Sequence, residues 1–400
     1  MKKSLFFALA VAGMFSSCSS EDAIVGGDQE NSELVPIELG VSSKVINGTR
    51  GTGTVGTVEN EDTEASASQW AGQKVNVYML DENLDVANFV SENPASLISG
   101  PIFENATLIT PTDGTSTAYR EDRLVKYYPS LGNFSFWGYR LDDPNAAEPQ
   151  KEGDEWNVDF TIDGSQDVMV AKTELSDEDK TTIAEWPTEN QGRLYSAYSA
   201  RHGVQPTLKF EHLLTRLAFK VKDAGMGEGE TESALKVVAI RVKSKTTGKL
   251  TIAYTGEKES VIAFNEDSKE FVSIKKRAEG TAVNEDLVNL TTEGDNTTYI
   301  PLTNSLETIG EALLVSPEDE YEMEIVLAQT VKTTEDGDTQ EELFPVPGII
   351  RPATEGDTFK TGYSYVVNVS VYGLQQIEIS TTLVPWTDGG NVDITPEDQF

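Results

Sequence analysis

The feature that most constrains the fold is an alternation of apolar and polar side chains with a period of two residues. It is longest near the C-terminus, where every second position is apolar or aromatic: Tyr363, Tyr365, Val367, Val369 and Val371. Successive side chains of a β-strand point to opposite faces of a sheet, so this pattern indicates strands with one buried face. Helical periodicity is scarce. The sequence therefore predicts an all-β protein.

The same alternation occurs in the N-terminal half. Val75, Val77 and Met79 share one strand face, and Phe134 and Phe136 share another. Gly, Asn, Asp and Pro interrupt the apolar segments at short intervals, as in YYPSLGN and TTGKL, which is turn chemistry between antiparallel strands. Many short strands separated by such turns predict β-sandwiches.

The length of the chain predicts two sandwiches, because about 380 residues are too many for one ordinary domain. The segment SAYSARHGVQP lacks a strand pattern and precedes the apolar run that begins at Thr207. We therefore expect an N-terminal domain over residues 36–203 and a C-terminal domain over residues 204–400.

The first residues predict export and a lipid anchor. Lys2 and Lys3 precede an apolar run that is too short to span a membrane, so residues 1–17 read as a signal peptide. Cys18, the sole cysteine, follows a segment that resembles a lipobox, and a single thiol has no partner for an intrachain disulfide. Several acyl chains on Cys18 would hold the protein at the outer membrane. The polar residues 18–35 are expected to form a tether.

The charge of the chain excludes one class of partner. The formal net charge is −36, and it becomes −38 without the two lysines of the signal peptide, from 29 basic and 67 acidic residues. Nucleic acid would be repelled, and no basic stripe interleaved with aromatic residues is present in the sequence. The acidic surface is expected to serve solubility.

Signals for catalysis or metal binding are weak. The two histidines, His202 and His212, have no metal-ligand spacing, and no nucleophile elbow, P-loop or dinucleotide fingerprint is present. His212 lies in a strand-like run between Phe210 and Leu214, where a hydrogen-bonded core histidine is expected. The sequence predicts no cofactor, no metal and no enzymatic activity.

Carboxylates and tryptophans leave other possibilities open. A glycosidase needs only two suitably placed acids, but 67 acidic residues make their proximity in sequence uninformative. The run Glu335–Glu342 lacks calcium-loop spacing and is expected to be a solvated hairpin tip. Tryptophans in strands are usually core anchors, although they also stack on sugars. Of the five tryptophans, Trp186 is the best candidate for exposure. The five are Trp70, Trp137, Trp156, Trp186 and Trp386.

The order of these segments resembles the fimbrillin-like lipoproteins of Bacteroidetes, a family of type V pilins. The resemblance runs from about Pro36 to Trp386, through PIELGVSSKV, WAGQKVNVYML, KYYPSLGNFSFWGY, DVMVAKTE, LKFEHLLTRLAFKV, TFKTGYSYVVNVSV and VPW. Ser19 to Asp22 also resemble the acidic tag of surface-exposed lipoproteins in these bacteria. The family implies two tandem transthyretin-like β-sandwiches and a place in a pilus.

The resemblance also implies a mechanism of assembly. Such pilins are cut after an arginine behind their first strand, and a strand from a neighbouring subunit fills the groove. Here Ile37, Leu39 and Val41 alternate in the first strand, and Arg50 stands behind it. Losing three such side chains from a core would cost of order 5 kcal/mol. The alternative is a permanent edge strand over Ile37–Val45 with Arg50 as an ordinary loop residue.

The donor strand is expected at the C-terminus, where Ile377 and Ile379 alternate with polar residues, although the final residues, 388–400, could equally form a plain tail. The predicted function is a fimbrial subunit or surface adhesin whose partners are other pilin subunits. Host proteins or glycans are further possible partners. The alternative is a surface glycan-binding lipoprotein of a polysaccharide-uptake system, which would need a row of exposed aromatic side chains.

Overall fold

A computed structural model describes most of the chain beyond the N-terminal segment. The described residues are 34–43, 73–91, 99–109, 117–120, 124–143, 145–227, 229–230, 233–277, 287–290, 299–332, 339–374 and 376–384. Cys18, Arg50, Trp70, Trp386 and the terminal tail lie outside them. None of the helices in the described part of the chain is both long and apolar enough to span a lipid bilayer.

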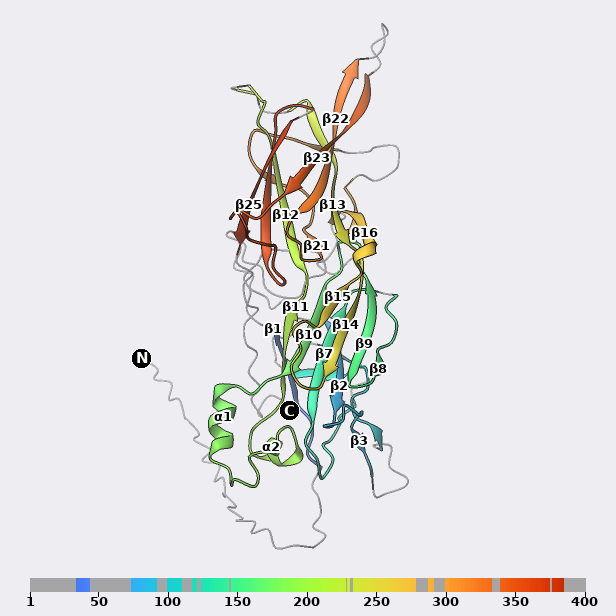
Figure 1. Ribbon diagram of the computed structural model, residues 1–400, viewed down its shortest axis with the longest axis vertical. Helices are drawn as coiled ribbons and strands as arrows, with labels where there is room; N and C mark the ends of the chain where they lie inside the picture. The colour runs from blue at the N-terminus through green and yellow to red at the C-terminus, as the bar shows by residue number, and fades with distance from the viewer. Residues whose placement is uncertain are drawn as a thin grey trace, which may run out of the picture. The chain divides into compact units, whose positions relative to one another are not determined.

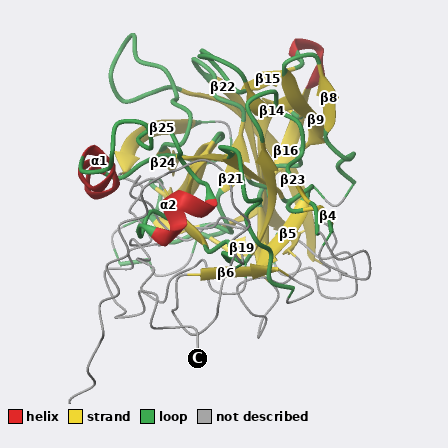
Figure 2. Ribbon diagram, turned by 90° about the horizontal axis from the view of Figure 1, so that it is seen from below, coloured by secondary structure: helices red, strands yellow, loops and turns green. Residues whose placement is uncertain are grey.

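The chain is all-β, as the alternating pattern predicts, and its strands form stacked sheets (Figures 1 and 2). One sheet closes on itself. In order of pairing it consists of β1 (Leu39–Ser43), β11 (Thr207–His212), β10 (Val168–Thr173), β7 (Ser135–Leu141), β2 (Lys74–Leu80), β5 (Ala106–Ile109) and β6 (Thr117–Arg120). A core that includes Val77, Phe136, Met169 and Phe210 fills its interior.

A four-stranded sheet packs on the outside of the closed sheet. Its strands are β15 (Ile262–Phe264), β14 (Thr247–Tyr254), β9 (Glu155–Thr161) and β8 (Gln150–Glu152). A second core lies between the two sheets, with Tyr78 and Trp137 on one side and Val158 and Leu250 on the other. Strands β2 and β7 are therefore buried on both faces, which interrupts their simple alternation.

The C-terminal part of the chain contributes a β-sandwich of two five-stranded sheets. One sheet contains β20 (Glu307–Thr308), β12 (Thr215–Asp223), β24 (Ser364–Val371) and β25 (Ile377–Val384), with β21 (Leu313–Val315) also on β12. The other contains β16 (Lys269–Ser273), β13 (Leu235–Lys245), β22 (Tyr321–Lys332) and β23 (Thr339–Ile350), with β19 (Ile300–Pro301) also on β13. A core that includes Val367, Val369 and Ile325 joins them.

The remaining elements are short. They are the pairs β3 (Asn88–Phe89) with β4 (Gly100–Pro101) and β17 (Lys275–Arg277) with β18 (Leu287–Asn289), the helices α1 (Asp177–Ala184) and α2 (Ala197–Arg201), and the 3-10 turn η1 (Glu266–Ser268). Helix α1 begins in a capping box, because the Asp179 amide donates to the Ser176 hydroxyl over 2.9 Å and the Ser176 amide donates to the Asp179 carboxylate over 3.0 Å.

Strand pairing crosses the predicted domain boundary at residues 203 and 204 in two places. Strand β11 follows the boundary in sequence but pairs with β10 and β1. Strand β14 pairs with β9 in the four-stranded sheet. The division into domains at 203 and 204 stays a prediction, and these two connections tie the segments on either side of it together.

Candidate functional site

The predicted detachable strand, β1, lies between two neighbours in the closed sheet. It pairs in parallel with β11, where Val41 lies opposite Leu208, and antiparallel with β6, where Leu39 lies opposite Ala118. The edge position in the alternative is therefore wrong, because β1 has a hydrogen-bonded partner on each side. The alternating residues 37–41 could not reveal this, since periodicity identifies the buried face and not the neighbours. Whether β1 stays in place permanently, with Arg50 as an ordinary loop residue, stays a prediction.

The residues before β1 extend the pairing. The Ile37 amide donates to the Lys126 carbonyl oxygen over 2.9 Å, and the Tyr128 amide donates to the Val35 carbonyl oxygen over 3.0 Å. Pro36 forms an isolated bridge with Tyr127. Backbone hydrogen bonds thus hold residues 35–43 on both sides, and removing this segment would leave the facing N–H and C=O groups without partners.

The side chains of β1 belong to the core of the closed sheet. Leu39 and Val41 are each 2% exposed, and Ile37 is half-buried against the same core. The predicted alternation of Ile37, Leu39 and Val41 on one buried face is thus present in the structure. Full burial of such side chains contributes about 1.5 to 3 kcal/mol each, so Leu39 and Val41 together contribute roughly 3 to 6 kcal/mol.

Aromatic rings line the same core. The Phe136 ring makes edge-to-face contacts with Tyr128 and Tyr195, at centroid distances of 6.3 Å and 6.2 Å, and lies 6.1 Å from Phe103. Burial, together with the neighbouring Tyr195 and Glu38, raises the pKa of the Tyr128 phenol. Packed rings of this kind resist collapse, so the space taken by Leu39 and Val41 would persist as a cavity if β1 left.

Strand β25, the predicted donor, has a different position. Among the strands that the structure describes, it is the last of its sheet and pairs with β24 alone. Ile377 and Ile379 are half-buried, as expected for one face of an outer strand, and their Cδ1 atoms approach Gly348 of the facing sheet. The Thr381 hydroxyl donates to the Arg351 carbonyl oxygen over 2.6 Å.

The other sheet of the sandwich ends in β23, which contains Pro345 and Pro347. Proline has no backbone N–H, and natural proteins use it on outer strands to prevent further pairing. Strand β25 contains no proline, so every residue of it carries an N–H. Of these two outer strands, β25 has an N–H at every residue, whereas β23 lacks one at Pro345 and Pro347.

The histidines occupy structural positions. His212 is buried, and its Nδ1 lies 2.7 Å from Oδ2 of the buried Asp167, which confirms a hydrogen-bonded core histidine. His202 is exposed, and its Nδ1 lies 2.8 Å from the Tyr198 carbonyl oxygen. Among the described residues, no group of three or more His, Cys, Asp or Glu is arranged to hold a metal ion.

The tryptophans differ from the prediction at one position. Trp186, the best candidate for exposure, is 7% exposed. Its ring packs edge-to-face on Tyr198 at 5.2 Å, in a small separate core with Ile183 and Val204. The prediction was wrong because residues close to α1 and α2 cover this ring. Trp137 is buried and Trp156 is half-buried.

These features define the class of protein: an all-β structural protein whose N-terminal strand is embedded in a sheet and whose C-terminal strand lies at a sheet edge. The chain belongs to the fimbrillin-like family, whose model matches residues 63–386. It is a fimbrial subunit or fimbrillin-like adhesin of the cell surface.

Solved structures with a similar arrangement were also found. A candidate cell adhesion protein from Bacteroides uniformis ATCC 8492 is 12% identical, with 90% of this chain and 100% of that chain covered and a TM-score of 0.42. The fimbrial anchor protein Mfa2 from Porphyromonas gingivalis is 11% identical. The match covers 88% of this chain and 99% of Mfa2, with a TM-score of 0.30. No curated protein matches the chain.

Proposed function

We propose that this chain is a pilus subunit that exchanges its first strand for a strand of a neighbouring subunit. In this proposal a protease cuts after Arg50 and releases β1. The observation that carries it is the position of β1: Leu39 and Val41 are buried in a core, strands pair with β1 on both sides, and Arg50 lies in the stretch 44–73 that joins β1 to β2.

Release of β1 would leave an open slot that a replacement strand can fill. Strands β11 and β6 would lose their backbone partners, and the core would lose the two fully buried side chains of β1. An incoming strand satisfies both needs, because its main chain supplies hydrogen bonds and its alternate side chains fill the apolar positions. The same slot therefore holds β1 in the precursor and a donor strand in the fibre.

Strand β25 is the proposed donor. Its Ile377, Ile379 and Thr381 alternate as Ile37, Leu39 and Val41 do. Ile377 and Ile379 are half-buried in their own sheet, Thr381 is buried, and among the described strands β25 has one neighbour, β24. Detaching β25 from its subunit thus removes less buried apolar surface than filling the vacant slot restores, which favours exchange between subunits.

The proposed location is the outer face of the outer membrane. Cys18 would carry the lipid during export, residues 18–35 would act as the tether, and cleavage after Arg50 would free the subunit from its anchor. This order of events explains why the anchor and β1 lie on the same side of Arg50 in the sequence.

The first experiment is intact-mass analysis and N-terminal sequencing of the protein recovered from the cell surface. We expect a chain that begins at Gly51 and forms ladders on gels under mild denaturation. The Arg50→Ala variant should keep β1 and form no ladders, whereas the control Lys44→Ala should behave as the natural chain does. A surface chain that still begins at lipidated Cys18 and forms ladders would contradict the proposal.

A cross-linking experiment tests the donor. Lys209 of β11 lies opposite Ser42 of β1. One subunit carries Lys209→Cys, and a second subunit carries Ser380→Cys on β25. Oxidation of mixed fibres should link the two subunits by a disulfide. The control pair uses Lys220→Cys on β12, outside the slot, and should not link. If the first pair also fails at every β11 position tried, β25 is not the donor.

A further inference from the structure

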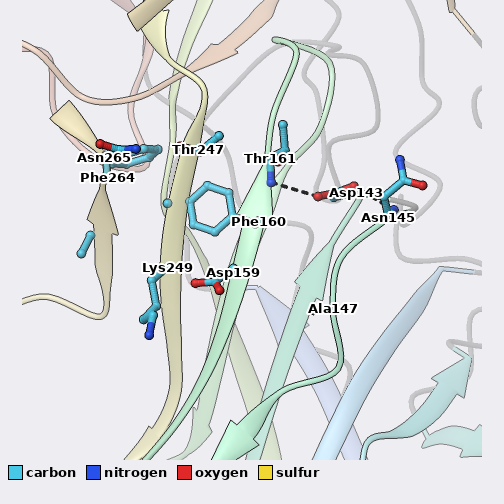
Figure 3. Close-up of a pocket in the computed structure, with 12 residues that line it drawn as sticks. Asp143, Asn145, Ala147, Asp159, Phe160, Thr161, Thr247, Lys249, Phe264 and Asn265 are labelled. Carbon is cyan, nitrogen blue, oxygen red and sulfur yellow. Dashed lines mark hydrogen bonds between the residues drawn. The ribbon is translucent and has the colours of Figure 1, made fainter. Parts of the chain in front are cut away.

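An open hollow of about 550 Å³ lies over the four-stranded sheet (Figure 3). Strands β9, β14 and β15 form its floor, and the segment between β7 and β8 forms one side. Its volume is within the range of ordinary small-molecule sites, roughly 300 to 1,000 Å³. All of its lining residues lie away from β1 and β25, so strand exchange does not account for it.

The floor of the hollow depends on Gly248. This residue lies opposite Phe160 on one side and opposite Phe264 on the other. A Cβ at Gly248 would lie 2.7 Å from Phe160 Cζ and 2.7 Å from the Ala263 carbonyl oxygen. Because glycine leaves this space, the two rings meet edge-to-face with centroids 5.6 Å apart. Phe160 is buried and Phe264 is half-buried, so Phe264 supplies the accessible apolar surface of the floor.

One side of the hollow is held in place by Asp143. Its Oδ2 accepts a hydrogen bond from the Thr161 amide over 2.9 Å, and its Oδ1 accepts one from the Asn145 amide over 2.8 Å (Figure 3). The bond from Thr161 attaches the segment between β7 and β8 to strand β9, and the bond from Asn145 fixes the turn within that segment. The Asn145 side chain is thereby placed at the rim, opposite Asn265.

The rest of the rim combines groups that donate and accept hydrogen bonds. Asp159 and Lys249 lie opposite each other on paired strands, and both are exposed. The Lys249 ammonium group donates to the Glu152 carboxylate over 3.1 Å, which leaves its other N–H groups for a ligand. The Asn265 side-chain oxygen accepts from the Asp267 amide over 3.1 Å, which orients its amide group at the edge of the hollow. Carboxylates accept, lysine donates, and asparagine and threonine do both.

We propose that this hollow binds a neutral sugar, one or two pyranose rings of a glycan chain. Each sugar hydroxyl both donates and accepts hydrogen bonds, which matches a rim that contains Asp159, Lys249 and two asparagines. A pyranose also presents an apolar face of C–H groups, which can pack against the half-buried Phe264 ring. The carboxylates of Asp143 and Asp159 would repel an acidic sugar, and the ammonium group of Lys249 would repel a cation.

The sugar site gives the subunit a second role. The exchange slot would join subunits to one another, and the hollow would attach the assembled fibre to a glycan on another surface. The two roles are independent, because the slot lies in the closed sheet and the hollow in the sheet stacked on it.

The test is ligand-observed NMR titration of the full chain with D-galactose, N-acetyl-D-glucosamine and their β-linked disaccharides. N-Acetylneuraminic acid is the acidic comparison and spermidine the cationic one. We expect saturable binding of at least one neutral sugar and none of the other two. Binding of the acidic sugar or the amine alone, or of no neutral sugar, would overturn the proposal.

Variants locate the binding. Asp159→Asn and Phe264→Ala should each weaken binding about tenfold, the equivalent of one good contact. Matched controls outside the hollow are Asp154→Asn, in the turn between β8 and β9, and Phe271→Ala, on β16. Both controls should bind as the natural chain does. Asp159→Asn changes an exposed side chain and should fold normally, so unchanged binding by this variant would exclude the site.

The Arg50→Ala variant separates the two proposals. It should bind the same sugars with unchanged affinity even though it forms no fibres. Sugar binding that disappears in this variant would mean that the glycan site arises only in the fibre and is not the hollow.

Discussion

Strands β1 and β25 carry similar alternating sequences, but the fold uses them differently. β1 is paired on both sides, and its Leu39 and Val41 are buried. β25 is paired on one side, and its Ile377 and Ile379 are half-buried. The sequence of a strand thus specifies which face is apolar. The neighbouring strands determine how far that face is buried, and so how much it contributes to the free energy of unfolding.

The contrast also assigns roles. A strand whose loss leaves a slot between two partners suits an acceptor site, because the vacancy is specific in shape and in hydrogen bonding. A strand at a sheet edge, without proline, suits donation.

The largest expected difference comes from truncating buried side chains. Leu39→Ala should lower the free energy of unfolding by about 2 to 5 kcal/mol, because it leaves a cavity in a packed core. Ile379→Ala should cost about half as much, since its side chain is only half-buried. Urea denaturation of the purified chain measures both. Val90→Ala, at a side chain 81% exposed, is the control. Equal losses for Leu39→Ala and Ile379→Ala would remove the contrast.

Two glycines give the next largest effect. A Cβ at Gly138 would lie 2.8 Å from Phe210 Cζ, inside the closed sheet, whereas a Cβ at Gly348 would lie 2.6 Å from Ile379 Cδ1. Gly138→Ala should therefore cost about 1 to 3 kcal/mol, because the buried ring has no room to move. Gly348→Ala should cost less than about 1 kcal/mol, since the nearest atom is the end of the half-buried Ile379 side chain, which has room to change its rotamer. Thermal denaturation compares the two, and the reverse order would show that β25 is the more rigid strand.

A single hydrogen bond tests the attachment of β25 to its own subunit. Thr381→Val keeps the shape of the side chain but removes the 2.6 Å bond to the Arg351 carbonyl oxygen. We expect a loss of about 1 kcal/mol and faster amide hydrogen exchange in β25, with exchange in β1 unchanged. Thr382→Val, at the exposed neighbouring position, is the matched control and should leave both rates unchanged.

The smallest effect is a pH dependence at the start of β1. Partial burial raises the pKa of the Glu38 carboxyl. The folded state then binds a proton more tightly than the unfolded state, so the stabilisation is complete below the ordinary value near 4.5 and is lost as the pH rises through the raised pKa.

Comparing the natural chain with Glu38→Gln checks this sign. The natural chain should gain stability relative to the variant, by a few tenths of a kcal/mol, as the pH falls from 7 to 4. Glu270→Gln, at an exposed position on β16, gives the baseline. A gain on raising the pH would mean that the Glu38 carboxyl is stabilised in its charged form.

Much of the fold could be predicted from the period-two pattern. Val75, Val77 and Met79 are fully buried on one face of β2, and Val367, Val369 and Val371 are fully buried in β24. The all-β class and the fimbrillin-like family were predicted correctly. These predictions were correct because the buried strand faces and the all-β class depend on short-range alternation, and the family depends on the order of motifs.

What could not be predicted depends on contacts between distant segments. The parallel partner of β1 is β11, which follows it by more than 160 residues, and no local signal encodes that pairing. Trp186 was predicted to be exposed because its sequence neighbourhood contains no strand pattern. The residues that cover its ring, among them Tyr198 and Val204, reach it only in the folded chain. The sugar site was also missed, because Asp143, Asp159, Lys249 and Asn265 converge from separate elements.

The connection of β1 to the rest of the chain has a kinetic consequence for assembly. β1 pairs with β11 and β6, but in sequence it is followed by β2, so the long stretch 44–73 is its covalent link to the strands behind it. While that stretch is intact, β1 competes for the slot at an effective concentration of order mM, far above any free subunit. In the proposed mechanism, the cut after Arg50 would turn β1 into a separate peptide that dissociates and is diluted. The intact connection would then keep subunits from polymerising until that cut is made.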